Sequence, residues 1–194
     1  SFFSIPLIFS LLVLSYDIVN VLFGEKWIGM VSIMRILCVY GLLRSIDSPL
    51  HELIKGTMKP KIIKYAALLN LLFLLISIYP LTKTFGAEGT AMAVLISLGL
   101  SEPLLHLNTF KKIKLPVSSF LKILYPQLSS GVIMMIMLYL SKLFIRGVSI
   151  LSLIGIIVFG FLIYLLGIYI LKKTLIRDIQ DLIKTLFKKN DSAA

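Results

Sequence analysis

Apolar residues fill six long stretches of this chain, and short polar links separate them. The stretches cover residues 2–24, 27–54, 62–82, 86–107, 117–140 and 147–171. Each holds about 20 residues or more, and a helix of that length, rising about 1.5 Å per residue, spans the roughly 30 Å hydrocarbon layer of a bilayer. Because lipid cannot satisfy free peptide groups, an open chain crosses it as α-helix. We therefore predict an all-α integral membrane bundle of six transmembrane helices over residues 1–171.

Residues 172–189 follow a different pattern. Their apolar members recur at helical spacing, and charged residues take the other face; the apolar members are Leu175, Ile176, Ile179, Leu182, Ile183, Leu186 and Phe187. This pattern predicts an amphipathic helix that is too polar to span the bilayer and lies on the inner leaflet, with its lysines toward anionic head groups. Docking to a partner protein is the alternative. We expect residues 190–194 to form a disordered tail.

The composition strengthens the membrane interpretation. Hydrophobic residues make up 58% of the chain and charged residues 15%, whereas a soluble domain is roughly 45 to 50% apolar. A net charge of +11 would suggest nucleic acid as the partner of a soluble chain. In a membrane protein the positions of the positive residues matter instead, so we expect the lipid bilayer and no nucleic acid as partner. Cys38 is the single cysteine and leaves no disulfide framework.

Basic residues fall on alternate links, which predicts the orientation. Most of them lie around the second link, around the fourth link and after the last stretch: Lys55, Lys59, Lys61, Lys64, Lys111, Lys112, Lys114, Lys122, Lys172, Lys173, Arg177, Lys184, Lys188 and Lys189. The opposite side carries only Lys26, Lys83, Lys142 and Arg146. The positive-inside rule then places the chain in the cytoplasmic membrane with both ends in the cytoplasm. Since the chain begins with Ser1 rather than Met, we expect it to be an internal portion of a longer polypeptide.

The second stretch carries the charges that need an explanation. Arg44, Asp47, His51 and Lys55 are spaced as one polar stripe on a helix, and Arg35, nine residues before Arg44, points to the opposite face. On insertion scales, each such group costs about 2.5 to 3.5 kcal/mol at mid-membrane. Partners or cargo must offset that cost.

Matched depths suggest those partners. Asp17 and Arg35 both lie about 10 to 12 Å below the outer ends of the first two helices, where they can pair as an ion bridge between helices. Glu102 shares a depth near the inner face with Arg44, where snorkelling toward the interface explains the charges equally well. We therefore predict an intramembrane polar network; its residues are Asp17, Asp47, His51 and Glu102.

Arg35 and Arg44 are also candidates for substrate binding. A guanidinium offers five donors in a planar fork that suits phosphate or carboxylate, so either arginine can hold an anionic head group if it faces a water-filled cleft. His51 and His106 are not spaced as a metal pair, and we expect them at the interface. We predict neither a metal site nor a cofactor. No Gly-rich phosphate loop or His-Glu-x-x-His motif is present, so the sequence favours transport over an enzyme, with a non-transporting structural subunit still possible.

Three segments resemble a known family. Residues 16–27, with Phe-Gly-Glu-Lys-Trp at their end, residues 35–38 and residues 41–46 are similar to the C-terminal half of polysaccharide exporters. These are flippases for lipid-linked oligosaccharides within the multidrug/oligosaccharidyl-lipid/polysaccharide exporter superfamily. Residues 86–91 and 160–164 fit the same pattern, and the resemblance covers about residues 6–171. The chain departs from the family at residues 56–60, where a small residue and Gly often precede Lys-Pro.

The resemblance implies a bundle with two lobes, of which this chain supplies the second. Members carry a glycolipid with a pyrophosphate head group across the membrane by alternating access, in a cation-lined cavity between the lobes. The partners implied are therefore a lipid-linked oligosaccharide and the N-terminal lobe of the same polypeptide. A drug or small-molecule exporter of the same superfamily is the alternative within transport.

Overall fold

The chain is built from helices. A computed structural model describes residues 3–57, 61–113, 117–144 and 150–191, and within them every regular element is helical. The elements are α1 (Ser4–Phe23), the short 3-10 helix η1 (Glu25–Trp27), α2 (Met30–Thr57), α3 (Lys61–Ile113), α4 (Val117–Phe144) and α5 (Ile150–Asp191). The all-α class predicted from the apolar stretches is confirmed for the described residues.

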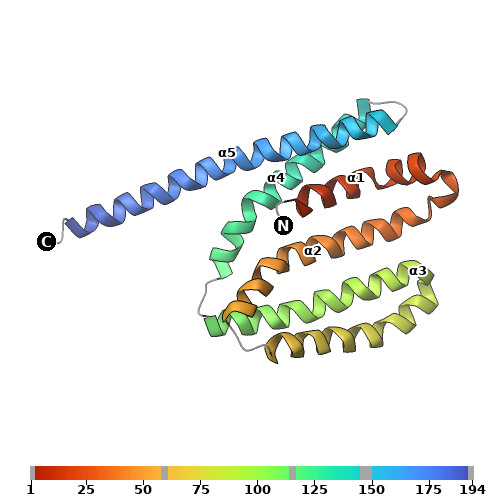
Figure 1. Cartoon of the computed structure of the whole chain (residues 1–194), viewed down its shortest axis with the longest axis horizontal. Helices are drawn as coiled ribbons and strands as arrows, with labels where there is room; N and C mark the ends of the chain where they lie inside the picture. Colours follow the sequence, from red (N-terminus) through yellow and green to blue (C-terminus); the bar gives the residue numbers. More distant parts are fainter. Residues whose placement is uncertain (1–2, 58–60, 114–116, 145–149, 192–194) are drawn as a thin grey trace.

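Helix α3 is a hairpin of two arms. Gly86 interrupts its helical geometry with φ 58° and ψ −133°, a conformation that residues with a Cβ rarely adopt. The first arm, residues 61–85, and the second arm, residues 87–113, run back along each other (Figure 1). Near the turn, the hydroxyls of Thr82 and Thr90 lie 2.8 Å apart, and further along Asn70 donates to Ser101 at 3.0 Å. The third and fourth apolar stretches are thus adjacent antiparallel helices.

Helix α1 lies at the centre of the arrangement. It packs against α2 on one side and against α4 and α5 on the other, and α2 in turn packs against α3 (Figure 1). The main apolar core lies between α1, α4 and α5; its buried members are Ile5, Phe9, Leu14, Met134, Leu138, Ile156, Tyr164 and Ile168. The interface between α2 and α3 is more polar, and the candidate functional site lies there.

Close contact between α4 and α5 depends on a small residue. A Cβ placed on Gly160 of α5 would lie 2.8 Å from Leu138 Cδ2 of α4, and the Leu138 side chain is fully buried. Small residues let helix backbones approach each other in membrane bundles, where dispersion contacts take the place of the hydrophobic effect.

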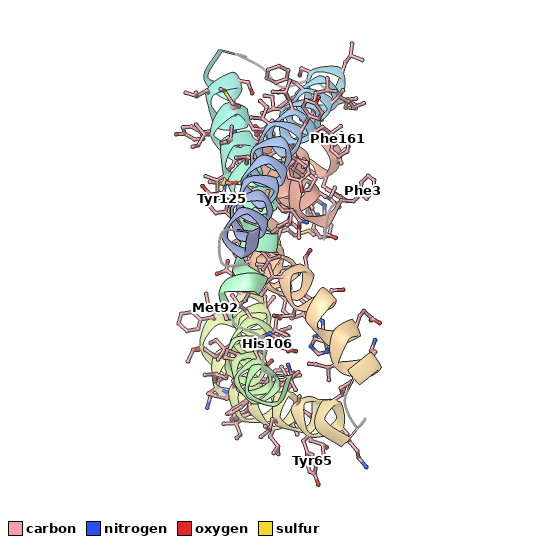
Figure 2. The ribbon with its side chains drawn as sticks, turned by 90° about the vertical axis from the view of Figure 1, so that its left-hand side faces the viewer. Phe3, Tyr65, Met92, His106, Tyr125 and Phe161 are labelled. Atoms are coloured by element: carbon pink, nitrogen blue, oxygen red, sulfur yellow. The ribbon has the colours of Figure 1, made fainter. Side chains whose placement is uncertain are left out.

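Large apolar side chains cover the outside of the molecule. Ile76 of α3 is 71% exposed and Leu151 of α5 is 82% exposed. Figure 2 shows Phe3 and Tyr65 pointing away from the helices in the same manner. A water-soluble monomer does not present contiguous apolar surface on this scale, whereas lipid chains solvate it. The apolar exterior therefore supports a multi-pass membrane protein.

Four segments of the described chain are long and apolar enough to cross a bilayer: Ser4–Phe23, Ile63–Pro103, Leu124–Lys142 and Ile150–Leu171. The predicted count is six. Helix α2 is not among the four because it carries more charged residues than a typical membrane span, and Ile63–Pro103 counts once although its 41 residues turn back at Gly86. Six crossings therefore remain a prediction that rests on whether α2 spans the bilayer.

Helix α5 continues beyond the last predicted crossing. It runs without a break from Ile150 to Asp191, so residues 172–189 extend the preceding helix instead of forming a separate one. Residues 190 and 191, expected to be disordered, continue α5, and residues 192–194 lie outside the described part. The amphipathic faces of residues 172–189 depend on side chains outside the described set.

Candidate functional site: a polar cluster between α2 and the second arm of α3

Helix α2 directs its polar stripe at the second arm of α3. The Arg44 guanidinium donates through Nη1 to Glu102 Oε1 at 3.1 Å, and His51 Nε2 donates to the other carboxylate oxygen, Oε2, at 2.9 Å. Glu102 therefore accepts hydrogen bonds from two side chains that lie two helical turns apart on α2. The depth shared by Arg44 and Glu102 coincides with a direct ion pair.

A second carboxylate–imidazole pair lies beside the first. His106 Nε2 donates to Asp47 Oδ1 at 2.7 Å and lies 4.0 Å from Glu102 Oε2. Asp47 and Glu102 are each only 7% exposed. We call Arg44, Asp47, His51, Glu102 and His106 the α2–α3 cluster.

The α2–α3 cluster explains how α2 carries so many charges. Buried charges persist where they are paired and hydrogen-bonded, and removing one partner of such a pair costs about 3 to 5 kcal/mol. Each carboxylate of the cluster meets an imidazole, and Glu102 also meets a guanidinium. Charge pairing therefore holds α2 to α3 where apolar packing holds α1 to α4 and α5.

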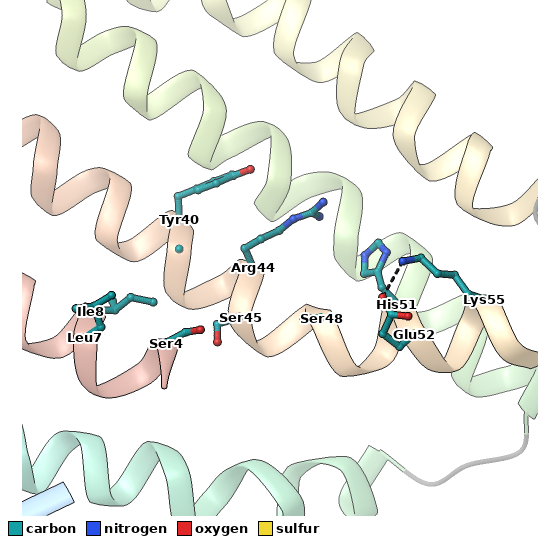
Figure 3. Close-up of a pocket in the computed structure, with 11 residues that line it drawn as sticks. Ser4, Leu7, Ile8, Tyr40, Arg44, Ser45, Ser48, His51, Glu52 and Lys55 are labelled. Atoms are coloured by element: carbon teal, nitrogen blue, oxygen red, sulfur yellow. Dashed lines mark hydrogen bonds and ion pairs between the residues drawn. The ribbon is translucent and has the colours of Figure 1, made fainter. Parts of the chain in front are cut away.

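Arg44 also borders open space. One groove of about 550 Å³ lies between the start of α1 and α2, and a second of about 500 Å³ lies between α2 and both arms of α3. Four residues line both grooves: Tyr40, Arg44, His51 and Lys55. Figure 3 shows them along the side of α2 that faces α3, while Ser45 lies on the opposite side toward Ser4. The Arg44 side chain is 53% exposed and the Lys55 side chain 57%.

The two grooves combine polar and apolar surface in similar proportion but differ in the side chains that line them. The α1–α2 groove has Ser4, Ser45 and Ser48 beside Leu7 and Ile8. The α2–α3 groove has Asn70 and Glu102 beside a set of aliphatic residues: Ile63, Ala66, Ala67, Leu71, Leu74 and Leu98. Arg44 thus borders a groove that carries serines and a groove that carries aliphatic side chains.

The predicted pair of Asp17 and Arg35 is wrong. Arg35 Nε donates instead to the fully buried Ser15 hydroxyl at 2.9 Å. Ser15 and Asp17 are two positions apart, which is about 200° around a helix, so the face of α1 that meets Arg35 turns Asp17 away from α2. The comparison of depths placed both residues at the right level in the bundle, but it did not give the direction in which each side chain points. Arg35 does face a different neighbour from Arg44, as its spacing predicts.

Asp17 pairs across the opposite interface. Lys142 Nζ of α4 lies 2.6 Å from Asp17 Oδ2, and the same ammonium lies 6.0 Å above the Tyr16 ring. The Asp17 side chain is 8% exposed and the Lys142 side chain 31%. This ion bridge joins α1 to α4, away from the grooves and from the α2–α3 cluster.

Two residues of these networks were absent from the predicted site. His106 was expected at the interface, yet its side chain is only 17% exposed and contacts Asp47. Its signal in the sequence is a repeated spacing: an acid followed four residues later by a histidine occurs at Asp47 and His51 and again at Glu102 and His106. Lys142 carries no such signal, because only packing of α1 on α4 brings it to Asp17.

Known proteins provide an independent comparison. A Klebsiella pneumoniae protein described as an uncharacterized membrane protein in cps region is 22% identical over 191 residues, which are 98% of this chain and 39% of that protein. The lipopolysaccharide biosynthesis protein WzxC of Escherichia coli (strain K12) is 41% identical over 49 residues, which are 25% of this chain and 10% of that protein. No protein-family model matches the chain, and no solved structure does.

These similarities support a distant relationship to polysaccharide-export-related membrane proteins. The Klebsiella pneumoniae similarity extends over nearly the whole chain, so it includes α2 and the α2–α3 cluster. The chain spans about two fifths of the length of that relative. The apolar helices and the similarity therefore agree on a multi-pass membrane protein.

Proposed function

We propose that this chain is part of a membrane transporter that moves lipid-linked oligosaccharide across the cytoplasmic membrane by alternating access, in the biosynthesis of capsule or lipopolysaccharide. The similarity to a membrane protein in cps region and to a lipopolysaccharide biosynthesis protein supports the process. The observation that carries the proposal is the Arg44 guanidinium, which is half exposed and borders both grooves.

The chemistry of Arg44 suits a pyrophosphate head group. A guanidinium has five donors, and the single Arg44 hydrogen bond among the described residues goes from Nη1 to Glu102. Lys55 and His51 line the same grooves and add further donors. In this proposal the head group binds Arg44, the glycan enters the α1–α2 groove with its serines, and the lipid chain lies along the aliphatic side chains of the α2–α3 groove.

Glu102 gives the head group a competitor for Arg44. When Arg44 turns to a phosphate, Glu102 keeps the hydrogen bond from His51, so a buried carboxylate is not left unpaired. Replacing the carboxylate of Glu102 by a phosphate as the partner of Arg44 favours the conformation in which Arg44 reaches the phosphate. The substrate then binds that conformation more tightly than the other, and such a difference in affinity is what shifts a conformational equilibrium. Arg35 has a secondary role, because its Nε is already engaged by Ser15.

Several further features belong to this proposal. The rest of the polypeptide provides the second lobe and the other wall of the cavity. Both ends of this segment lie in the cytoplasm, where residues 172–189 continue α5 beyond its membrane-crossing part. The protein acts as a transporter, not as an enzyme, and takes no nucleic acid as partner.

Two alternatives make different predictions. A drug or small-molecule exporter would use the same grooves for a cationic or neutral compound, and the exposed arginine argues against a cation. A non-transporting structural subunit would use the α2–α3 cluster only to join helices. The cluster fits that role as well, but joining helices requires no arginine that faces open grooves.

The test is restoration of surface polysaccharide in a flippase-deficient strain by the full-length protein. Arg44→Ala is expected to lower the polysaccharide by about 10- to 100-fold, the equivalent of one or two charged hydrogen bonds, with Arg44→Lys intermediate because it keeps the charge and loses the fork. Protein level is measured in parallel, and Lys26→Ala in the exposed η1 serves as the control.

Each outcome has a definite meaning. Failure of the wild-type protein to restore polysaccharide, together with resistance to cationic drugs, would favour the drug exporter. Normal polysaccharide from Arg44→Ala at normal protein level would exclude Arg44 as the head-group ligand.

A further inference from the structure

Two identical side-chain patterns face each other across the α2–α3 interface. Asp47 and His51 lie four residues apart on one face of α2, and Glu102 and His106 lie four residues apart on one face of the second arm of α3. The contacts run diagonally, from His51 to Glu102 and from His106 to Asp47. Three donors that metals prefer, from Asp47, Glu102 and His106, therefore lie close together, and His51 adds a fourth beside Glu102, in a place where the sequence predicts no metal site.

The spacing of these donors matches a metal site. In a tetrahedral zinc site with bonds of about 2.0 to 2.1 Å, the ligand atoms lie about 3.3 to 3.4 Å from one another. Here His106 Nε2 lies 2.7 Å from Asp47 Oδ1 and 4.0 Å from Glu102 Oε2, and His51 Nε2 lies 2.9 Å from Glu102 Oε2. Donor atoms of Asp47, Glu102 and His106 all lie within 4.8 Å of one another. The tetrahedral separation requires the donor atoms of Asp47, Glu102 and His106 to approach one another by up to about 1.5 Å, and His51 Nε2, which contacts Glu102, to turn toward the other two.

We propose that Asp47, Glu102 and His106, with His51 as the fourth donor, bind one divalent transition-metal ion of the Zn²⁺ type. Two imidazoles and two carboxylates form a ligand set that suits zinc and its first-row neighbours, whereas Mg²⁺ requires six oxygens in octahedral geometry. Arg44, His51 and Glu102 also belong to the proposed function, but Zn²⁺ binding is measured without any transported substrate.

The surroundings of the site support a metal. Arg44 donates to Glu102 Oε1, which leaves Oε2 directed at the imidazoles, and an outer hydrogen bond of this kind orients a metal-binding carboxylate. The cluster holds two carboxylates and one guanidinium, and a metal binds the imidazoles in their neutral form, so a cation can take the place of imidazole protons between the carboxylates. His51 and Glu102 also line the α2–α3 groove, which gives the ion a path into a site whose carboxylates are nearly buried.

The decisive measurement is Zn²⁺ binding by the intact polypeptide, purified free of metal in detergent micelles and titrated against a chelating dye. We expect one Zn²⁺ per chain, no competition from excess Mg²⁺, and the visible absorption of a tetrahedral ion when Co²⁺ replaces Zn²⁺. His106→Gln and Asp47→Asn are each expected to weaken binding by about 100-fold or more, because even outer-shell changes cost 10- to 100-fold. Both substitutions keep polar, similarly sized side chains, and size-exclusion chromatography and circular dichroism verify their fold.

The matched control is Glu52→Gln. Glu52 is also an acidic residue of α2, but its side chain is 69% exposed and pairs with Lys55 outside the cluster. Unchanged Zn²⁺ affinity in Glu52→Gln supports the proposal. Absence of stoichiometric binding to the wild-type protein, equal weakening in Glu52→Gln, or full affinity in correctly folded His106→Gln and Asp47→Asn would each show that the cluster is only an ion-pair network.

Discussion

The partner of a charged residue in this bundle depends on the direction of its side chain as much as on its depth. Asp17 and Arg35 lie at similar depths, yet each finds a different neighbour: Lys142 for the carboxylate and Ser15 for the guanidinium. Glu102 and Arg44 lie at similar depths and do pair. A helix turns about 100° per residue, so side chains at the same depth can point in different directions. A contact between helices requires both a shared depth and side chains that point toward each other.

The Asp17–Lys142 bridge leads to an asymmetric prediction. Lys142→Met leaves the carboxylate buried without its cation, and we expect a loss of about 3 to 5 kcal/mol of stability. Asp17→Asn costs less, because the long Lys142 side chain is already partly exposed and can extend toward the interface. The double variant should recover most of the loss. Folded protein in membranes and thermal unfolding in detergent are the measurements.

Transport in these variants separates the bridge from the α2–α3 cluster. Because Asp17 lines neither groove, the double variant should transport normally once its level is restored. Equal instability of the two single variants, without recovery in the double variant, would show that the pair does not stabilise the protein.

At the scale of elements, the turn of α3 shows what a single backbone conformation contributes. Gly86 has φ 58° and ψ −133°, and a Cβ at this position would meet no atom within 4 Å. A larger side chain would therefore have room at this position, but the backbone conformation disfavours any residue with a Cβ. The turn directs the second arm of α3 back along the first, so that Glu102 and His106 face the polar stripe of α2.

Replacing this glycine provides the second prediction. Gly86→Ala should destabilise the protein by about 1 to 3 kcal/mol, the range for a residue held in a sparsely populated backbone region. Gly99→Ala in the same helix is the control, since Gly99 is exposed, lacks the positive φ, and has room for a methyl group with no atom within 4 Å of it. Thermal unfolding of both variants in detergent is the measurement. A Gly99→Ala loss as large as that of Gly86→Ala would contradict the explanation.

Helix lengths are the part of the fold that apolar periodicity predicts well. The stretches at residues 2–24 and 117–140 correspond closely to α1 and α4, because burial in lipid requires a hydrogen-bonded helix wherever about 20 apolar residues follow one another. The approach fails where polarity changes gradually. Helix α5 passes from apolar to charged residues near position 172 and simply continues, since Lys, Leu, Ile and Arg all tolerate a helix.

At the scale of the whole molecule, the architecture depends on whether α2 spans the bilayer. Its charges exclude it from the four apolar candidates, but Arg44, Asp47 and His51 pair with side chains of α3 instead of standing alone. Internal pairing lowers the cost of insertion that hydropathy alone assigns to α2. We therefore expect α2 to cross, with its polar stripe facing the second arm of α3.

Thiol labelling tests this topology. In a Cys38→Ser background, single cysteines at Lys26, Lys59, Lys83 and Lys112 are treated in intact cells with a membrane-impermeant reagent. We expect labelling at Lys26 and Lys83 and protection at Lys59 and Lys112, because the positive-inside rule keeps the lysine-rich links in the cytoplasm. A cysteine at the buried Ser97 is the unlabelled control.

The labelling at Lys26 and Lys59 decides whether α2 crosses the bilayer. If Lys26 and Lys59 are labelled alike, α2 does not cross and the number of crossings is not six. Labelling at Lys112 without labelling at Lys83 would reverse the orientation.

The sequence by itself determined the environment and the building blocks of this protein. Long apolar runs require lipid and helices whatever their neighbours, and the distribution of lysines and arginines predicts a sidedness, because both effects depend only on local composition and the bilayer. Only the tertiary structure decided which charges meet. Pairing depends on the rotation and crossing of helices far apart in the chain, so His106 reached Asp47 and Lys142 reached Asp17 through packing that local periodicity does not encode.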